Sequence, residues 1–320
     1  MSIVLDASVW ASAVRGATPI LLAAFGCLLC AKAGITNLAI DGFITIGCFI
    51  SVAVVSLTGG NVWLGMLGGI VGTAVYSLIF GLSVIKFKSN HIIASIAMNL
   101  LSTGITEFLM APVFKAQGLY RLANIKKIPP VSLPFLEHVP VLNVLVNNQS
   151  IVVLFTIILI FILLYMLRKT KYGLNVIAIG QSAEAAESAG IKSDRVRWSV
   201  ILLSGAFCGL AGSYLSTIIL SEFSVGMVAG RGFTAYTTVV FGAYHPVGVA
   251  FASLLFGFAD ALSIQIELLK PGIATSLVSM VPYILAMVVL TISALSDKLR
   301  KTGRLEMKWK QRKQKNQIVH

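Results

Sequence analysis

Long apolar runs separated by short polar segments dominate the chain. Each run is about as long as the roughly 20 residues that a helix needs to cross a hydrocarbon core. The runs lie at about 11–31, 36–57, 62–85, 92–113, 150–167, 199–220, 233–262 and 273–295. This pattern predicts an all-α polytopic membrane protein with about 8–10 transmembrane helices.

Two of these runs are irregular. The run 233–262 is interrupted by Gly242 and Pro246, and the run 36–57 contains Asp41 near its start. Non-helical backbone at membrane depth is tolerated only where protein or a cavity lines it. We therefore expect discontinuous or re-entrant segments here, each returning to the side from which it entered.

Composition and charge also indicate a membrane protein. Of the 320 residues, 57% are hydrophobic and only 12% are charged, whereas a soluble domain carries roughly 25% charged residues. Lys and Arg concentrate in the loop 168–198 and the tail 298–320, and such loops face the cytoplasm. Since Trp309 is the only aromatic residue in the tail, no nucleic-acid partner is expected.

The basic segments also suggest a topology. If both irregular runs return, the turn at 86–88, the loop 168–198 and both termini share the cytoplasmic side. The proline-containing loop 114–149 then lies outside. We predict a membrane domain over 1–297, a basic cytoplasmic tail over 298–320, and two similar halves arranged as a parallel transporter repeat.

Small residues repeat at four-residue spacing in two runs. Gly65 and Gly69 lie in one, and Gly205, Gly209 and Ser213 lie in the other. Small residues at this spacing let helices approach closely in lipid, so tight packing is expected here. The four cysteines lie inside apolar runs and are expected to pack as small hydrophobic residues, without a disulfide framework.

No catalytic or nucleotide-binding motif is recognisable. The segment closest to a phosphate-binding loop, 26–32, places Ala31 and Ala33 where glycine and a hydroxyl residue are needed. The four histidines are scattered, so no metal site is expected. The sequence therefore predicts a protein that is not an enzyme and that holds no cofactor of its own.

Polar side chains inside the runs need an explanation, because a charge in the bilayer costs roughly 2.5–3.5 kcal/mol on insertion scales. Asn37 and Asp41 lie near the start of the second run, and Asn99 and Glu107 lie two turns apart in the fourth. These four residues are candidates for lining a translocation path. A structural alternative exists for Asp41, whose carboxylate could accept backbone N–H groups at a helix start.

The loop 168–198 contains a predicted short helix over 183–189. Ser182 suits the N-cap position, Glu184 the positive end of the helix dipole, and Gly190 the stop. A helix of about two turns is unstable alone, so we expect it to dock on a partner; a solvated turn is the alternative. The candidate docking residues are Gly180, Ser182, Glu184, Ala185, Ala186, Glu187 and Gly190.

Three stretches carry a family resemblance: Ala33–Gly42, Thr170–Ile191 and Gly230–Pro246. They resemble the permease subunits of ATP-binding-cassette importers of the branched-chain amino acid and ribose class, especially the nucleoside and simple-sugar subfamily. In the first stretch, Ala39 and Asp41 replace the usual Gly and Glu of that family.

The resemblance implies a multi-pass subunit of a bacterial-type inner membrane with a cytoplasmic C-terminus. It implies a second permease subunit, cytoplasmic ATPases that hold ATP and Mg, and an external binding protein that delivers a nucleoside or simple sugar. The loop 168–198 would couple the permease to the ATPase. Two other classes stay open, namely a secondary transporter or channel without an ATPase, and a membrane-embedded enzyme.

Overall fold

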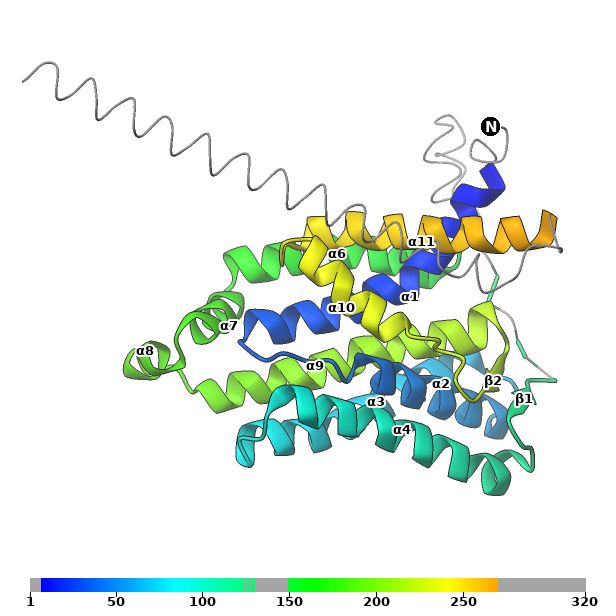
Figure 1. Ribbon diagram of the computed structural model, residues 1–320, viewed down its shortest axis with the longest axis horizontal. Coiled ribbons are helices and arrows are strands. Elements are labelled where there is room, and N and C mark those ends of the chain that lie inside the picture. Colours follow the sequence, from blue (N-terminus) through cyan, green and yellow to red (C-terminus); the bar gives the residue numbers. More distant parts are fainter. Residues whose placement is uncertain (1–6, 124, 127, 130–148, 270–320) are drawn as a thin grey trace, which may run out of the picture. The chain divides into compact units, whose positions relative to one another are not determined.

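The computed structural model describes residues 7–123, 125–126, 128–129 and 149–269. Most of this part is helical, and its two short strands pair antiparallel with Leu119 opposite Ser224 (Figure 1). The elements are α1 (Ala7–Lys32), α2 (Ile40–Leu57), α3 (Val62–Gly81), α4 (His91–Phe114), β1 (Leu119–Arg121), α6 (Ile151–Lys169), α7 (Lys171–Gln181), α8 (Ala183–Ser188), α9 (Ser193–Ser213), β2 (Glu222–Ser224), α10 (Arg231–Phe241) and α11 (Pro246–Leu269). The account below concerns the compact unit that ends at Leu262.

Six helices of the described part are long and apolar enough to cross a membrane. They correspond to the first six predicted runs; two of them, α3 and α9, continue through π-helical turns at Leu82–Lys86 and Tyr214–Ile219. The prediction of an all-α polytopic membrane protein is confirmed. The run 273–295 and the tail 298–320 lie outside the described residues.

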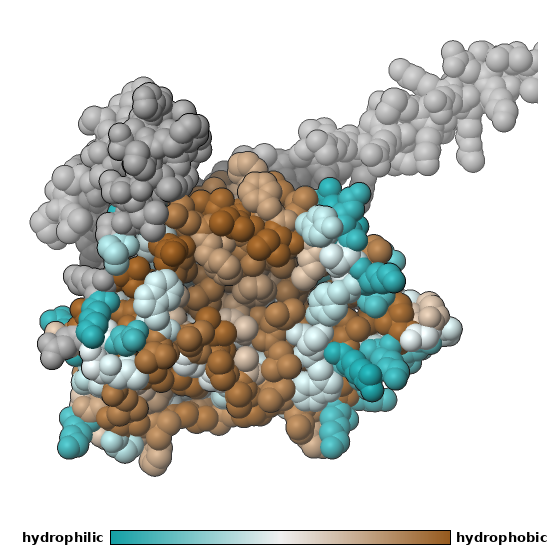
Figure 2. All heavy atoms as spheres, turned by 180° about the vertical axis from the view of Figure 1, so that it is seen from behind, coloured by the Kyte–Doolittle hydropathy of each residue, from teal (hydrophilic) through white to brown (hydrophobic). Residues whose placement is uncertain are grey.

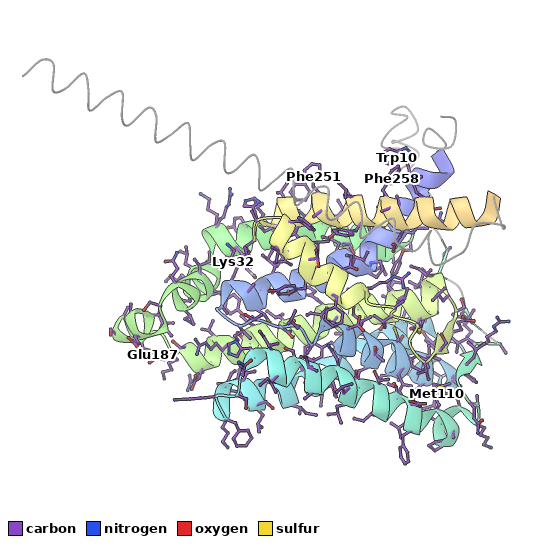
Figure 3. The ribbon with its side chains drawn as sticks, viewed as in Figure 1. Trp10, Lys32, Met110, Glu187, Phe251 and Phe258 are labelled. Atoms are coloured by element: carbon purple, nitrogen blue, oxygen red, sulfur yellow. The ribbon has the colours of Figure 1, made fainter. Side chains whose placement is uncertain are left out.

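The helices of this unit run between two ends of the bundle. One end, here called the strand end, carries β1 and β2; the other, here called the coupling end, carries α7 and α8 (Figure 1). Figure 3 shows Met110 of α4 toward the strand end and Glu187 at the tip of α8. The described start of the loop 114–149 therefore lies opposite the loop 168–198, as the basic residues predict.

The segment that contains Asp41 crosses the bundle and does not return. Helix α1 ends at Lys32 on the coupling end, residues 33–39 lead back into the bundle without forming a helix, and α2 continues to the strand end (Figure 1). The prediction of a returning run 36–57 is therefore wrong. Side chains of neighbouring helices satisfy the hydrogen bonds of the non-helical backbone. The segment can therefore cross the bundle instead of returning to the coupling end. The first turn of α1 consequently lies at the strand end, away from the basic loops.

The other irregular run, 233–262, forms α10 and α11. Helix α10 leads to the coupling end, where Arg168 of α6 contacts His245. Helix α11 then returns toward the strand end, where Phe258 and Trp10 have ring centroids 4.8 Å apart. This run returns as predicted. However, α2 and α10 point in opposite directions (Figure 1), so a parallel repeat does not describe these two broken segments.

Glycines bring α2, α3 and α9 into backbone contact. A Cβ added to Gly47 would lie 2.9 Å from Gly209 Cα, and one added to Gly209 would lie 2.4 Å from Gly69 O. The close packing predicted from the four-residue spacing is confirmed. Each of these helices can approach the others only because these positions lack side chains.

The surface of the unit matches a membrane setting. Figure 2 shows apolar residues gathered across the middle of one face, with hydrophilic residues toward both ends. Exposed side chains on the outer face of α6 include Phe155, Ile158, Phe161 and Ile162. Exposure of these side chains has no hydrophobic cost in a membrane, because lipid tails are as apolar as the side chains themselves.

Candidate functional site

The non-helical segment 33–39 is held by a row of polar side chains on α4. The Thr36 N–H donates to His91 Nδ1 at 3.3 Å, and the Leu38 N–H donates to Ser95 Oγ at 3.0 Å. Since residues four apart share one face of a helix, α4 presents this row along the segment. The row satisfies backbone groups that lipid would leave without partners.

Asn99 continues this row and binds both sides of the α2 start. Its Nδ2 donates to Leu38 O at 3.0 Å, and its Oδ1 accepts from the Gly42 N–H at 2.8 Å. A Cβ at Gly42 would lie 2.9 Å from the same Oδ1, so this position must lack a side chain for the bond to form. Asn99 therefore ties the non-helical segment to the first turn of α2.

Asn37 fixes the segment from the other side. The residue is 1% exposed, its Oδ1 accepts from the Ala39 N–H at 3.0 Å, and its Nδ2 donates to Ser204 Oγ of α9 at 3.2 Å. A carbonyl and an amide that are both engaged within the protein leave little capacity for a solute. The geometry therefore gives Asn37 a structural role.

Asp41 joins the starts of two helices. Its Oδ1 accepts from the Gly232 N–H, 191 residues away, at 2.9 Å. Asp41 lies in the first turn of α2 and Gly232 in the first turn of α10, so the positive ends of both helix dipoles converge on one carboxylate. As the structural alternative predicts, the Asp41 carboxylate accepts a backbone N–H at a helix start, but this helix is α10 and not its own. Asp41 remains only partly buried.

Glu107 does not join this group. Asn37 and Asp41 lie within residues 33–42 and Asn99 binds this region. Glu107 instead lies on the exposed face of α4, two turns closer to the strand end than Asn99. The structure therefore brings three of the four candidate path residues together. The expectation that Glu107 faces the interior of this bundle is wrong for the single chain.

The predicted helix of the loop 168–198 is present as α8. The Ser182 hydroxyl accepts from the Ala185 N–H at 3.3 Å, as predicted for an N-cap. At the other end the Ile191 N–H donates to Ala186 O at 3.0 Å, and Gly190 has a φ of +84°. A helix end of this type requires a residue in the left-handed conformation, which glycine adopts without strain.

The faces of α8 divide the candidate docking residues. Glu184, Ala185 and Glu187 are exposed, whereas Ala186 is 4% exposed and packs into the chain itself. Gly180 also faces inward, because its Cβ would lie 2.0 Å from Lys32 O at the end of α1. Figure 3 shows Lys32 on this side of the bundle, near α7.

Helix α7, which the sequence patterns did not predict, anchors α8 to the bundle. The Thr170 hydroxyl caps its start by accepting from the Gly173 N–H at 3.1 Å. Tyr172 Oη and Ser199 Oγ of α9 lie 2.7 Å apart, and burial raises the pKa of Tyr172. The phenol therefore stays protonated at neutral pH, and α7 remains hydrogen-bonded to α9.

Several residues of the site escaped sequence reasoning. The polar row on α4 had a detectable signal, since His91, Ser95 and Asn99 recur every four residues in an otherwise apolar helix. Ser204 had none, because its partner Asn37 lies 167 residues away along the chain. Gly232 lies in the stretch Gly230–Pro246 that carries the family resemblance, but its contact with Asp41, 191 residues away, had no signal. Among the described residues, no group of three or more His, Cys, Asp or Glu side chains could hold a metal ion.

Broken helices that meet inside an all-helical membrane bundle are a feature of transporters. A model of the family described as branched-chain amino acid transport system / permease component matches residues 10–290. The chain belongs to this family. It is therefore a multi-pass membrane permease subunit of an ATP-binding-cassette transporter and not an enzyme.

Relatives with assigned names cover nearly the whole chain. The nucleoside ABC transporter permease protein NupC of Lactococcus lactis subsp. cremoris is 31% identical over 86% of this chain and 88% of its own length. The guanosine ABC transporter permease protein NupQ of Bacillus subtilis is 32% identical with the same two coverages. A glucose ABC transporter permease protein of Haloferax volcanii is 25% identical over 86% of this chain and 74% of its own length.

Proposed function

We propose that this chain forms the translocation path for a nucleoside or simple sugar in an ATP-driven importer. The observation that carries the proposal is similarity over 86% of the chain to permeases named for nucleoside and guanosine transport. The joined starts of α2 and α10, which place polar groups inside the bundle, support a path for a polar solute. An external binding protein delivers the solute to the strand end.

Cytoplasmic ATPase subunits supply the energy and hold the ATP and Mg. The exposed face of α8, formed by Glu184, Ala185 and Glu187, docks on the ATPase. Ser182 and Gly190 set the ends of this helix, while Ala186 and Gly180 fix it to the rest of the chain. The coupling end therefore faces the cytoplasm, as do the turn at 86–88 and the C-terminal tail.

A second permease subunit, either a related chain or a second copy, covers the exposed face of α4. This face carries Glu107 beside apolar residues, and lipid offers a carboxylate no partner. A Cβ at Gly104, one turn away, would meet no atom within 4 Å, so another helix could approach closely there. Glu107 would then lie between two permeases, beside the path.

Uptake of labelled solutes tests the proposal. Cells that express the chain with its ATPase and binding protein should accumulate labelled nucleosides or simple sugars, and cells that lack only this chain should not. The purified chain alone should show no ATPase activity. Equal uptake by both strains for every nucleoside and sugar would contradict the proposed function.

A further inference from the structure

Hydrogen-bonding capacity is unevenly used where α2 and α10 meet. The amides of Asn37 and Asn99 are engaged with the protein on both their oxygen and nitrogen atoms. Asp41 makes one hydrogen bond to the described residues, through Oδ1 to Gly232. A carboxylate has about four acceptor positions on its two oxygens, so most of the capacity of Asp41 is unused by the described part of the chain.

Arg231 carries unused donors within electrostatic range of this carboxylate. It precedes Gly232 in the first turn of α10, and its charge acts electrostatically on Asp41. One guanidinium nitrogen, Nη1, donates to Met227 O and Val228 O at 3.3 Å each. A guanidinium carries five N–H donors, so within the described part of the chain the Nε and Nη2 groups are left to bind something else.

Asp41 and Arg231 lie well inside the bundle, where unused hydrogen-bond acceptors and donors need an explanation. Arg231 lies ten residues before the end of α10 at Phe241, which corresponds to about 15 Å along a helix. A group this far from the helix end lies within the bundle and not at its coupling end; the hydrocarbon core is about 30 Å thick. Charged groups at this depth in a transporter mark a solute pathway or pair with the protein.

We propose that Asp41 and Arg231 together bind the hydroxyl groups of the transported solute, specifically the ring diol of a nucleoside or sugar. The free carboxylate oxygen accepts from the two hydroxyls, and the guanidinium donates to a hydroxyl or ring oxygen. The inference rests on the proposed function, whose solute class it narrows to molecules with adjacent hydroxyls.

The test compares two solutes in one assembled transporter. Initial uptake of a ribonucleoside and of its 2′,3′-dideoxy analogue is measured for wild type, Asp41→Asn and Arg231→Gln, with the same ATPase and binding protein. Asn can still accept from the Gly232 N–H, so Asp41→Asn keeps the bond between α2 and α10. Membrane abundance of each variant is measured by quantitative immunoblot and used to normalise uptake.

We expect Asp41→Asn to lower ribonucleoside uptake about tenfold, the size of one hydrogen bond to a charged group. Uptake of the dideoxy analogue should change less than twofold, and Arg231→Gln should act in the same direction. Asp260→Asn is the control, because Asp260 of α11 also interacts electrostatically with Arg231 but makes no hydrogen bond to α10 within the described residues. It should leave the ratio of the two uptakes unchanged.

An equal loss for both solutes would assign Asp41 and Arg231 a purely structural role and overturn the inference, as would unchanged uptake of both. A ratio altered as strongly by Asp260→Asn would also overturn it. If wild type takes up no nucleoside or sugar at all, the proposed function fails first, and that result is distinguishable from the others.

Discussion

Gly232 and Asp41 lie so close that backbone meets backbone at the junction of α2 and α10. A Cβ at position 232 would lie 2.3 Å from Asp41 N and 2.4 Å from Asp41 Cα. Neither atom can move without displacing the first turn of α2. The hydrogen bond between the two helix starts therefore depends on the missing side chain at 232.

Gly232→Ala should weaken the folded chain, because a single methyl group forces the two helix starts apart. Overpacking of this kind costs about 1–3 kcal/mol, and thermal unfolding of the purified chain in detergent measures it. Gly104→Ala is the matched control, since a Cβ there meets no atom within 4 Å. Equal melting temperatures for the two variants would contradict the tight junction.

Asn99→Leu should also lower thermal stability. The change keeps a side chain of similar size but removes the partners of the Gly42 N–H and the Leu38 carbonyl. Each unpaired backbone group costs about 1–3 kcal/mol. Thr103→Val serves as the control, because this exposed hydroxyl donates only to a carbonyl of its own helix. The idea fails if both variants melt at the wild-type temperature.

At the scale of elements, local and distant causes determine different parts of the structure. The sequence was sufficient to predict α8, since Ser182 and Gly190 act within one turn of their own positions. It could not predict the non-helical segment, because Asn37 depends on Ser204, 167 residues away. The inward orientation of Ala186 was missed for the same reason, as the packing of α8 on the chain sets it.

The two alanines of α8 should respond differently to a bulky side chain. Ala185→Trp should leave membrane abundance near the wild-type level while abolishing co-purification of the ATPase, because Ala185 is exposed on the proposed docking face. Ala186→Trp should reduce abundance of the permease itself, because this side chain is 4% exposed. Co-purification and immunoblotting of membranes distinguish the two outcomes. Retained ATPase binding in Ala185→Trp would remove α8 from the interface.

Gly190→Val should detach the ATPase without removing the chain from the membrane. The φ of +84° at this position is strained for a β-branched residue, so the last turn of α8 should unwind. Gly190→Asn is the milder comparison, because asparagine tolerates the left-handed conformation. Co-purification of the ATPase should fall far more for valine than for asparagine. Equal binding by both would show that the helix stop is unimportant for docking.

At the scale of the whole molecule, apolar runs and basic loops predicted the membrane class and the opposite sides of the loops 114–149 and 168–198. They did not predict the direction of the segments around Asp41 and Gly232. A hydropathy pattern records how many residues are apolar, but it does not record which backbone groups find partners in other helices. The position of the first turn of α1 at the strand end depends on these hydrogen bonds, so the hydropathy pattern did not predict it.

Cysteine labelling tests the topology. Gln117→Cys, near the strand end, should react with a membrane-impermeant thiol reagent in intact cells, whereas Glu187→Cys should react only after permeabilisation. Both positions are exposed. The four native cysteines are buried, so the wild-type chain supplies a low background. Labelling of Glu187→Cys in intact cells would reverse the orientation.

At Gly180 and Gly34, the backbone of α7 contacts the backbone that follows α1. A Cβ at Gly180 would lie 3.2 Å from Gly34 N, so α7 touches the first residues after α1 without any intervening side chain. Flexible side chains could absorb a small displacement, but a contact between two backbones transmits it. Figure 1 shows residues 33–39 running lengthwise from this contact to α2. Residues 33–39 are also hydrogen-bonded to α4 and α9. A movement of α7 by the proposed ATPase would therefore reach the helix start that carries Asp41 through this bonded segment, together with α4 and α9.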